Sequence, residues 1–266
     1  MTASMGERAG GKVFLVGAGP GAPDLLTVRA ARVLARADIV FHDALVHPET
    51  IAMAEGAERV AVGKRSGKHS TAQRFINKRL IDAARKHEVV VRLKGGDPML
   101  FGRAQEEIAA LEAAGVAYEV VPGVTAALAA SAELGISLTQ RGLARSVVFL
   151  TPRVGESEKP NAWAHAAAST DTAVIYMGAG QAALIADALL AQGMAAATPV
   201  MVIENATLPC RRQFTLALCD LPRVADFGLT GPALIMIGEI YSEALAKACN
   251  ASPQAQYAWT ASSKTR

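Results

Sequence analysis

The sequence predicts an α/β protein of two domains, with a parallel sheet in the N-terminal domain and a mixed sheet in the C-terminal domain. In the first half, short runs rich in β-branched residues alternate with segments whose apolar residues recur at helical spacing, as in sheets of parallel strands covered by helices. In the second half the same alternation begins again, and strand-like runs then follow one another with little helix between them. That change indicates hairpins and therefore a mixed sheet.

The predicted strands are short apolar runs bounded by polar or glycine-rich turns. Those of the first half are Val13–Val16, Ile39–His42, Arg59–Val62, Val89–Leu93 and Tyr118–Val121. Between them, the predicted helices are Leu25–Arg36, Thr71–Lys86 and Gly102–Ala114. The strands of the second half are Ser146–Leu150, Thr172–Met177, Pro199–Ile203, Arg212–Leu216 and Ala233–Gly238. We therefore place the domains at residues 12–122 and 126–245, and expect mobile tails at 1–11 and 251–266.

Composition excludes several classes of protein. A net charge of +3 over 266 residues gives no argument for nucleic-acid binding. No uncharged apolar run reaches the roughly 18 residues of a membrane span. The cysteines Cys210, Cys219 and Cys249 lack the spacing of a metal site and cannot all pair, as in a reducing cytosol. We expect a cytoplasmic protein without a metal, a nucleic-acid partner or a membrane partner.

A glycine-rich loop, GAGPGAPD, follows the first strand directly after Val16. Glycines allow a tight turn and let a ligand approach the backbone. The relaxed spacing of a dinucleotide-binding loop is met by Gly17, Gly19 and Ala22. Asp43 stands about 20 residues further on, where such loops place their acidic residue. Pro20 and Pro23 oppose this interpretation because they lack the N–H groups that a pyrophosphate needs. We favour a less charged ligand, with a non-catalytic dinucleotide-binding protein as the alternative.

Further loops at strand ends carry small or polar residues. After the fourth strand, Gly95 and Gly96 again allow close backbone approach. Asp97 either binds a ribose or an ammonium group or caps a helix. Thr125, after the fifth strand, likewise either caps a helix or faces a ligand. Because the carboxyl ends of parallel strands meet at one edge of a sheet, we expect these loops to surround a common crevice.

The segments VGAGPGAPDLLT, VFHDALV, VGKRSGKH, VVRLKGGDPMLFGRAQEE, VVPGVTAA, YMG and ENAT occur in the order found in tetrapyrrole methylases. Over roughly Lys12 to Ile240 the chain resembles the uroporphyrinogen-III C-methyltransferases of that family. The resemblance implies a homodimer of two-domain subunits, with the active site in the cleft between the domains. It also implies methylation of uroporphyrinogen III by S-adenosylmethionine at C-2 and C-7, through precorrin-1 to precorrin-2, for sirohaem or cobalamin synthesis. S-adenosylhomocysteine is the coproduct, and a later precorrin methyltransferase is the alternative within the family.

The resemblance also implies roles for individual residues. Those that contact S-adenosylmethionine are Pro20, Gly95, Gly96, Asp97, Leu100, Thr125, Ala126, Met177, Ala206 and Ala233. Asp43 matches a proton acceptor and Lys64 a proton donor, although Asp43 also fits a simple turn at a strand end. An ordinary lysine pKa of about 10.4 favours Lys64 as a ligand of a substrate carboxylate. For the other substrate carboxylates, the forked guanidinium groups suggest Arg65, Arg92, Arg103 and Arg141.

Overall fold

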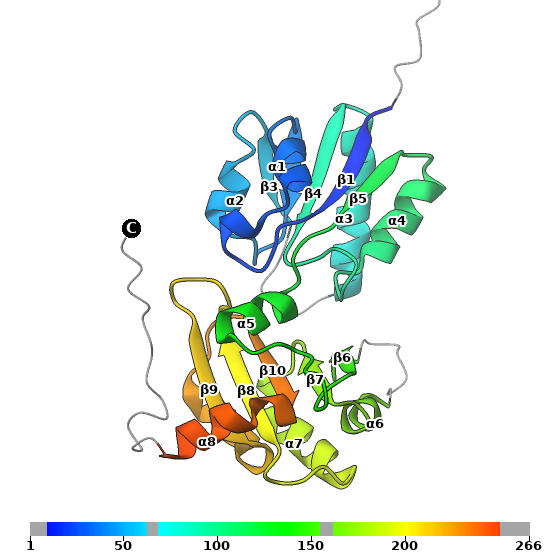
Figure 1. The fold of residues 1–266 in the computed structure, drawn as a ribbon. Helices are drawn as coiled ribbons and strands as arrows, with labels where there is room; N and C mark the ends of the chain where they lie inside the picture. The colour runs from blue at the N-terminus through cyan, green and yellow to red at the C-terminus, as the bar shows by residue number, and fades with distance from the viewer. Residues whose placement is uncertain (1–9, 63–68, 155–161, 251–266) are drawn as a thin grey trace, which may run out of the picture. The chain divides into compact units, whose positions relative to one another are not determined.

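A computed structural model describes residues 10–62, 69–154 and 162–250 (Figure 1). The chain divides into two compact units, one ending at Thr125 and the other beginning at Ala126. Each unit contains one sheet with helices packed on both faces. This confirms the predicted fold class of two α/β domains, one parallel and one mixed. Lys64, Arg65 and almost all of the predicted tails lie outside the described residues.

The first unit has a parallel sheet in the order β3-β2-β4-β1-β5. Its strands are β1 Lys12–Gly17, β2 Ile39–His42, β3 Glu58–Ala61, β4 Val89–Lys94 and β5 Tyr118–Val121. Its helices are α1 Val28–Leu34, α2 Pro48–Ala52, α3 His69–Ala84 and α4 Ala104–Ala113, with a 3₁₀ turn η1 Pro23–Leu25. Helices α1 and α2 pack against one face of the sheet, and α3 and α4 against the other.

The central strand β4 has both faces covered. Val91 and Leu93 pack with the α1 and α2 side of the sheet, whereas Val90 packs with the α3 and α4 side. Successive side chains of a strand point to opposite faces, so Arg92 and Lys94 share the face of Val90. Both cations are therefore buried beneath helices, which decides how the candidate site is built.

Two predicted helices begin later than expected. The helix predicted from Leu25 starts as α1 at Val28, because the Thr27 hydroxyl accepts a hydrogen bond from the Ala30 N–H (3.2 Å) and caps it there. The helix predicted from Gly102 starts as α4 at Ala104, after Arg103 in the left-handed region (φ 56°). In both places the extra residues lengthen a loop at the carboxyl edge of the sheet.

The second unit has the order β6-β7-β10-β8-β9, in which β6 and β7 are parallel and the other neighbouring pairs antiparallel. Its strands are β6 Val147–Leu150, β7 Thr172–Ile175, β8 Pro199–Glu204, β9 Arg212–Ala217 and β10 Ala233–Gly238. Its helices are α5 Ala126–Leu134, α6 Trp163–Ala168, α7 Ala182–Ala191 and α8 Ser242–Asn250. The 3₁₀ segments are η2 Ala179–Gln181, η3 Leu218–Phe227 and η4 Glu239–Tyr241. Across the described part of the chain, none of the helices combines the length and apolarity needed to cross a membrane.

Candidate active site

In the first unit, the loops after β1 and β4 are joined by backbone hydrogen bonds. The Gly19 N–H donates to the Gly96 carbonyl (3.2 Å), and the Gly96 N–H donates to the Gly19 carbonyl (2.7 Å). The Ala18 N–H donates to the Lys94 carbonyl (2.7 Å). The two glycine-rich segments singled out in the sequence are therefore neighbours that support each other.

The loop after β5 packs against the same pair through glycines. A Cβ atom on Gly17 would lie 2.6 Å from the Cα of Gly123 and 2.8 Å from the carbonyl oxygen of Gly96. These obstacles are backbone atoms, so a side chain at Gly17 cannot be accommodated by a rotamer change. Glycine at positions 17 and 123 thus permits three loops to meet without side chains between them. Gly123 was not predicted as a site residue, although it belongs to the VVPGVTAA segment.

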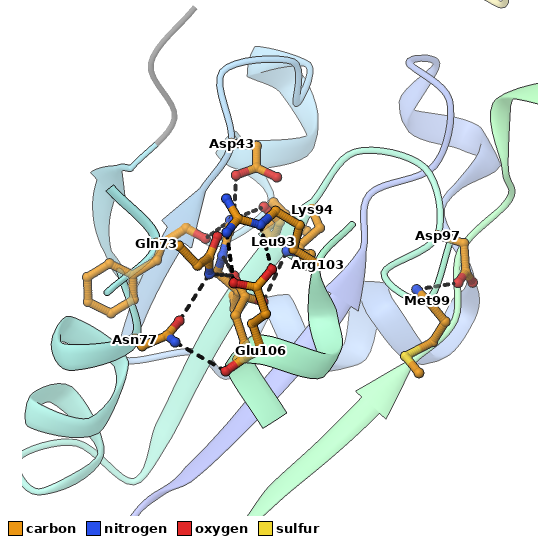
Figure 2. Close-up of polar contacts among 12 residues, drawn as sticks. Asp43, Gln73, Asn77, Leu93, Lys94, Asp97, Met99, Arg103 and Glu106 are labelled. Atoms are coloured by element: carbon orange, nitrogen blue, oxygen red, sulfur yellow. Dashed lines mark hydrogen bonds and ion pairs between the residues drawn. The ribbon is translucent and has the colours of Figure 1, made fainter. Parts of the chain in front are cut away.

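Asp97 cross-links the loops. Its Oδ1 accepts from the Met99 N–H (2.8 Å; Figure 2) and its Oδ2 from the Gly123 N–H (2.9 Å). The carboxylate therefore forms a turn and does not cap α4, which begins at Ala104. A carboxylate oxygen has two lone pairs, so each oxygen retains room for a hydroxyl or ammonium donor. Half-buried Asp97 and exposed Gly95 fit the polar part of a nucleoside with an amino-acid chain.

The strand tips of the second unit carry strained backbone. Met177 (φ 56°) follows β7, and Asn205 (φ 52°) and Thr207 (φ 71°) follow β8. Within the described ranges, the other non-glycine residues with positive φ are Phe101 and Arg103, after β4. All five lie in segments to which the family resemblance assigns cofactor contacts. Such conformations cost energy and concentrate at binding sites, where the surroundings hold them in place.

Glu204, at the end of β8, binds the backbone of the segment that precedes β10. Its Oε1 accepts from the N–H groups of Thr230 and Gly231 (both 2.6 Å), and its Oε2 pairs with the Arg212 Nε (2.6 Å). The residue is 1% exposed. Burial alone would raise the pKa of Glu204, but the bonds from Arg212, Gly231 and Thr230 outweigh it and the pKa is lowered.

The segments that carry Ala206 and Ala233 consequently lie side by side. The Asn205 N–H donates to the Pro232 carbonyl (2.9 Å), and Ala233 is paired with Glu204 in the ladder between β8 and β10. Ala206 is buried and Ala233 is half-buried. These two predicted cofactor residues are 27 positions apart in the chain and are neighbours in the fold.

The start of α5 is fixed within the second unit. The Ala127 N–H donates to the hydroxyl of Tyr176 (3.0 Å), the residue before Met177. This bond therefore brings the predicted residues close together in the fold: Ala126 precedes Ala127, and Met177 follows Tyr176. Tyr176 itself was not predicted as a site residue, although it belongs to the YMG segment.

Asp43 lies at the end of β2 above a buried network of charges (Figure 2). Its Oδ1 is 2.5 Å from Nη2 of Arg92, and its side chain is 32% exposed. Arg92 itself is 2% exposed, and its Nε donates to the buried carboxylate of Glu107 (3.0 Å). Lys94 donates to the other oxygen of Glu107 (3.0 Å).

Burial and charge oppose each other in this network. Burial alone would lower the pKa of Arg92, but the carboxylates of Asp43 and Glu107 outweigh it and the pKa is raised. For Lys94 burial is again the largest cause, Arg92 adds to it, and the pKa is lowered despite Glu107 and Asp43. Arg92 is therefore a permanent cation under Asp43, and Lys94 a cation that depends on its carboxylate partner.

This geometry corrects the interpretation of Arg92 as a substrate ligand. Its guanidinium is bound to Asp43, to Glu107 and to the carbonyl groups of Phe41 and Leu93, so it has no exposed fork to offer a substrate. The sequence suggested an exposed Arg92 because the residues of the strand do not reveal that helix α4 covers this face of the sheet.

The remaining predicted residues are placed as follows. Pro20 and Leu100 are half-buried in the loops after β1 and β4, and Thr125 is buried after β5. Arg103 is partly exposed and pairs with Glu106 (2.6 and 2.7 Å).

Arg141 is exposed in the second unit. It lies in the turn between α5 and β6, away from the strand ends that carry Met177 and Ala206 in the chain, and the cleft between the units stays a prediction. In the residues that the structure describes, histidine, cysteine and carboxylate side chains form no group that could hold a metal ion.

Comparison with known proteins identifies the family. The family described as Tetrapyrrole (Corrin/Porphyrin) Methylases matches residues 12–221. The Uroporphyrinogen-III C-methyltransferase of Pseudomonas aeruginosa is 47% identical over 231 residues, which cover 86% of this chain and 94% of that protein.

The Siroheme synthase of Pseudomonas fluorescens is 45% identical over 232 residues, or 86% of this chain and 50% of the relative. The chain thus spans about half the length of the siroheme synthases that it matches. A solved structure of uroporphyrin-III C-methyl transferase from Thermus thermophilus, complexed with S-adenyl homocysteine, is 39% identical with a TM-score of 0.76. That match covers 88% of this chain and 100% of the other. The chain therefore belongs to the tetrapyrrole methylase family.

Proposed function

We propose that the protein is an S-adenosylmethionine-dependent C-methyltransferase that converts uroporphyrinogen III through precorrin-1 to precorrin-2. The relative from Pseudomonas aeruginosa supports the substrate, and the Thermus thermophilus complex supports the cofactor. The observation that carries the proposal is the carboxyl edge of the first sheet. There a carboxylate anchored by a buried arginine, Asp43, follows β2, and glycine-lined loops follow β1, β4 and β5.

The cofactor is held by backbone-lined loops. In the first unit we assign Pro20, Gly95, Gly96, Asp97, Leu100 and Thr125 to it, and in the second unit Ala126, Met177, Ala206 and Ala233. The Gly17–Gly96–Gly123 packing and the Asp97 cross-link support this assignment because they let three loops meet without side chains between them. S-adenosylmethionine supplies a methyl group on a positively charged sulfur, which is a good electrophile without activation by the protein.

The chain's own chemical task is to align the reacting carbon and to manage charge. A pyrrole carbon that has gained a methyl group leaves its ring cationic until a proton departs. A carboxylate near the ring stabilises that cation and accepts the proton, and Asp43 is suited to this because Arg92 fixes its direction. Positioning by such fixed groups contributes up to about 7–11 kcal/mol in favourable cases.

The carboxylates of the substrate need cationic partners. We assign Arg103 and Arg141, which are at least partly exposed, and Lys64 and Arg65, which lie outside the described residues. Arg103 would exchange its bonds to the Glu106 carboxylate for bonds to a substrate carboxylate, so the guanidinium keeps the same kind of partner. We further propose a homodimer in the cytoplasm, and the free, exposed cysteines Cys210, Cys219 and Cys249 suit that reducing compartment.

The test compares the wild type with Asp43→Asn, which keeps the shape of the side chain and removes its charge. The wild type incubated with uroporphyrinogen III and S-adenosylmethionine should yield the dimethylated chromophore, measured by absorbance and mass spectrometry. Asp43→Asn should lower kcat by about 10²–10⁴-fold, the usual contribution of an acid–base group. Its affinity for S-adenosylhomocysteine, measured by calorimetry, should change less than about twofold, because the glycine loops are held by other bonds. A wild type that methylates only a later precorrin, or binds NAD and not S-adenosylhomocysteine, would refute the proposal.

A further inference from the structure

Two cations are buried next to each other on β4. Arg92 and Lys94 are two residues apart on one face of the strand and are 2% and 3% exposed. Like charges at that spacing repel each other, and burial removes the water that would screen them. Of the two cations, Asp43 pairs with Arg92 alone, and both lie on the face covered by α3 and α4, so a counter-charge shared by the two comes from those helices.

Glu107 of α4 supplies that counter-charge and is completely buried. Its Oε1 accepts from the Arg92 Nε and its Oε2 from the Lys94 Nζ, both at 3.0 Å. From α3, the side-chain amide of Gln73 donates to Oε1 (3.2 Å) and to the Oδ1 of Asn77 (3.0 Å; Figure 2). With both oxygens bound, the Glu107 carboxylate has one orientation.

The guanidinium of Arg92 transmits that orientation to Asp43. Its Nε is held by Glu107, its Nη1 donates to the Leu93 carbonyl (3.2 Å), and its Nη2 donates to Asp43 (2.5 Å). Because a guanidinium is planar and rigid, fixing its Nε edge also fixes the direction of Nη2. Asp43 is about one-third exposed, and without this anchor its side chain is free to change rotamer.

We propose that Glu107 is a positioning residue for methyl transfer: it bridges Arg92 and Lys94, holds the Arg92 guanidinium in place and thereby fixes the Asp43 carboxylate toward the substrate. The inference rests on the proposed function of Asp43. Glu107 is buried and touches neither substrate nor cofactor, so its effect reaches the reaction through Arg92.

Glu107→Gln tests the proposal at constant side-chain shape. The amide has one oxygen and one NH₂ group, so whichever way it is turned, a donor faces one of the two cations. The network then contains Arg92, Lys94 and a single carboxylate, Asp43. Either Arg92 leaves its place or Lys94, whose pKa is already lowered, gives up its proton. In both cases the bond that fixes Arg92 is weakened.

We expect Glu107→Gln to lower kcat by about 10–100-fold, the effect of a displacement of about 1 Å in a reacting group. KM for uroporphyrinogen III and the Kd of S-adenosylhomocysteine should change less than about threefold, with rates expressed per enzyme able to bind S-adenosylhomocysteine. The matched control is Glu112→Gln, on the same helix but exposed and bonded to the Tyr118 hydroxyl (2.7 Å). Its kcat should equal that of the wild type.

The double variant Asp43→Asn/Glu107→Gln shows whether Glu107 acts through Asp43. If it does, the double variant should be no slower than Asp43→Asn alone, because the group that Glu107 positions is already inactive. If the two losses multiply, Glu107 has another role and the inference is overturned. A normal kcat for Glu107→Gln also overturns it, while leaving the proposed function intact if Asp43→Asn is slow. A normal kcat for Asp43→Asn removes the proposed role of Asp43, and the inference falls with it.

Removal of a buried charge also threatens folding, so circular dichroism and thermal unfolding accompany the kinetics. If Glu107→Gln does not fold, Lys94→Met/Glu107→Gln replaces it, because this pair of changes removes one cation with one anion. The double change should restore folding while leaving the Arg92 Nε without its carboxylate. A kcat lowered at least tenfold supports the inference if adding Asp43→Asn makes the enzyme no slower than Asp43→Asn alone. A kcat equal to that of the wild type overturns it.

Discussion

Gly17→Ala should disrupt the glycine-rich loops of the first unit. Gly17 ends β1 where the loops after β4 and β5 meet it, and a Cβ there would stand 2.6 Å from the Cα and the N of Gly123 and 2.8 Å from the carbonyl oxygen of Gly96. Ordinary carbon–carbon contacts lie at about 3.5–4.0 Å, so the loops must separate by about 1 Å. Every one of these atoms is backbone, and the strain cannot be relieved by a side chain.

The separation has a cost for stability and a cost for binding. Overpacking a well-packed site typically costs about 1–3 kcal/mol, which would lower the Tm by several degrees. The displacement also strains the 2.9 Å bond from the Gly123 N–H to Asp97 and the paired bonds between Gly19 and Gly96. If the three loops hold the cofactor, a shift of about 1 Å should lower the affinity for S-adenosylhomocysteine by about 10–100-fold.

Titration calorimetry with S-adenosylhomocysteine and thermal unfolding measure the two effects. Gly56→Ala is the matched control in the same unit, because none of the described atoms lies within 4 Å of a Cβ there and its φ is not positive. The control should change stability by less than about 0.5 kcal/mol and leave the affinity unaltered. If Gly17→Ala remained folded and bound S-adenosylhomocysteine like the wild type, the assignment of these loops to the cofactor would be refuted.

Two further predictions concern the second unit. Glu204→Gln should destabilise it by about 3 kcal/mol at neutral pH, because it breaks a buried charge pair. The pKa of Glu204 is lowered in the fold, so its stabilisation is present above the unfolded value of about 4.3 and is lost as pH falls through the folded value. The difference in Tm between variant and wild type should therefore shrink in acid, and a constant difference would contradict this. Met177→Gly should relieve the positive φ and raise stability by up to about 1 kcal/mol in thermal unfolding. Met177 is 45% exposed, and removal of its side chain should lower the affinity for S-adenosylhomocysteine if the residue lines the pocket. An affinity equal to that of the wild type would exclude Met177 from the site.

The strands could be predicted from the sequence because local composition decides them. A buried parallel strand such as β4 requires consecutive apolar residues, and Val89, Val90 and Val91 supply them in a run that is too short for a helix. Helix starts were less accurate because a single hydroxyl decides them. Thr27 caps α1, which starts at Val28, three residues after the predicted start, and hydrophobic spacing does not reveal which polar residue forms the cap.

The loops of the candidate site could also be predicted, but the charges beneath them could not. Glycines and Asp97 at strand ends are visible in the sequence itself. The role of Glu107 depends on its packing across α4 against β4, and that of Glu204 on a loop 26 residues away along the chain. A warning was nevertheless present. Arg92 and Lys94 stand within a strand flanked on both sides by apolar strands, and two buried cations require a carboxylate nearby.

Glu107 and Glu204 solve the same physical problem in the two units. Where the loops of the first unit meet, at Gly17, Gly96 and Gly123, no side chains lie between them, so apolar side-chain packing does not hold them in place there. A buried ion pair is a poor source of stability compared with a hydrophobic cluster of equal volume, but it imposes direction, since each bond must meet its partner's geometry. Each of these glutamates lies under strand tips and binds groups that lead to the candidate site: Arg92 and Lys94 in one unit, the Thr230 and Gly231 N–H groups in the other. Their placement is therefore better explained by the need to orient the loops than by the free energy of folding.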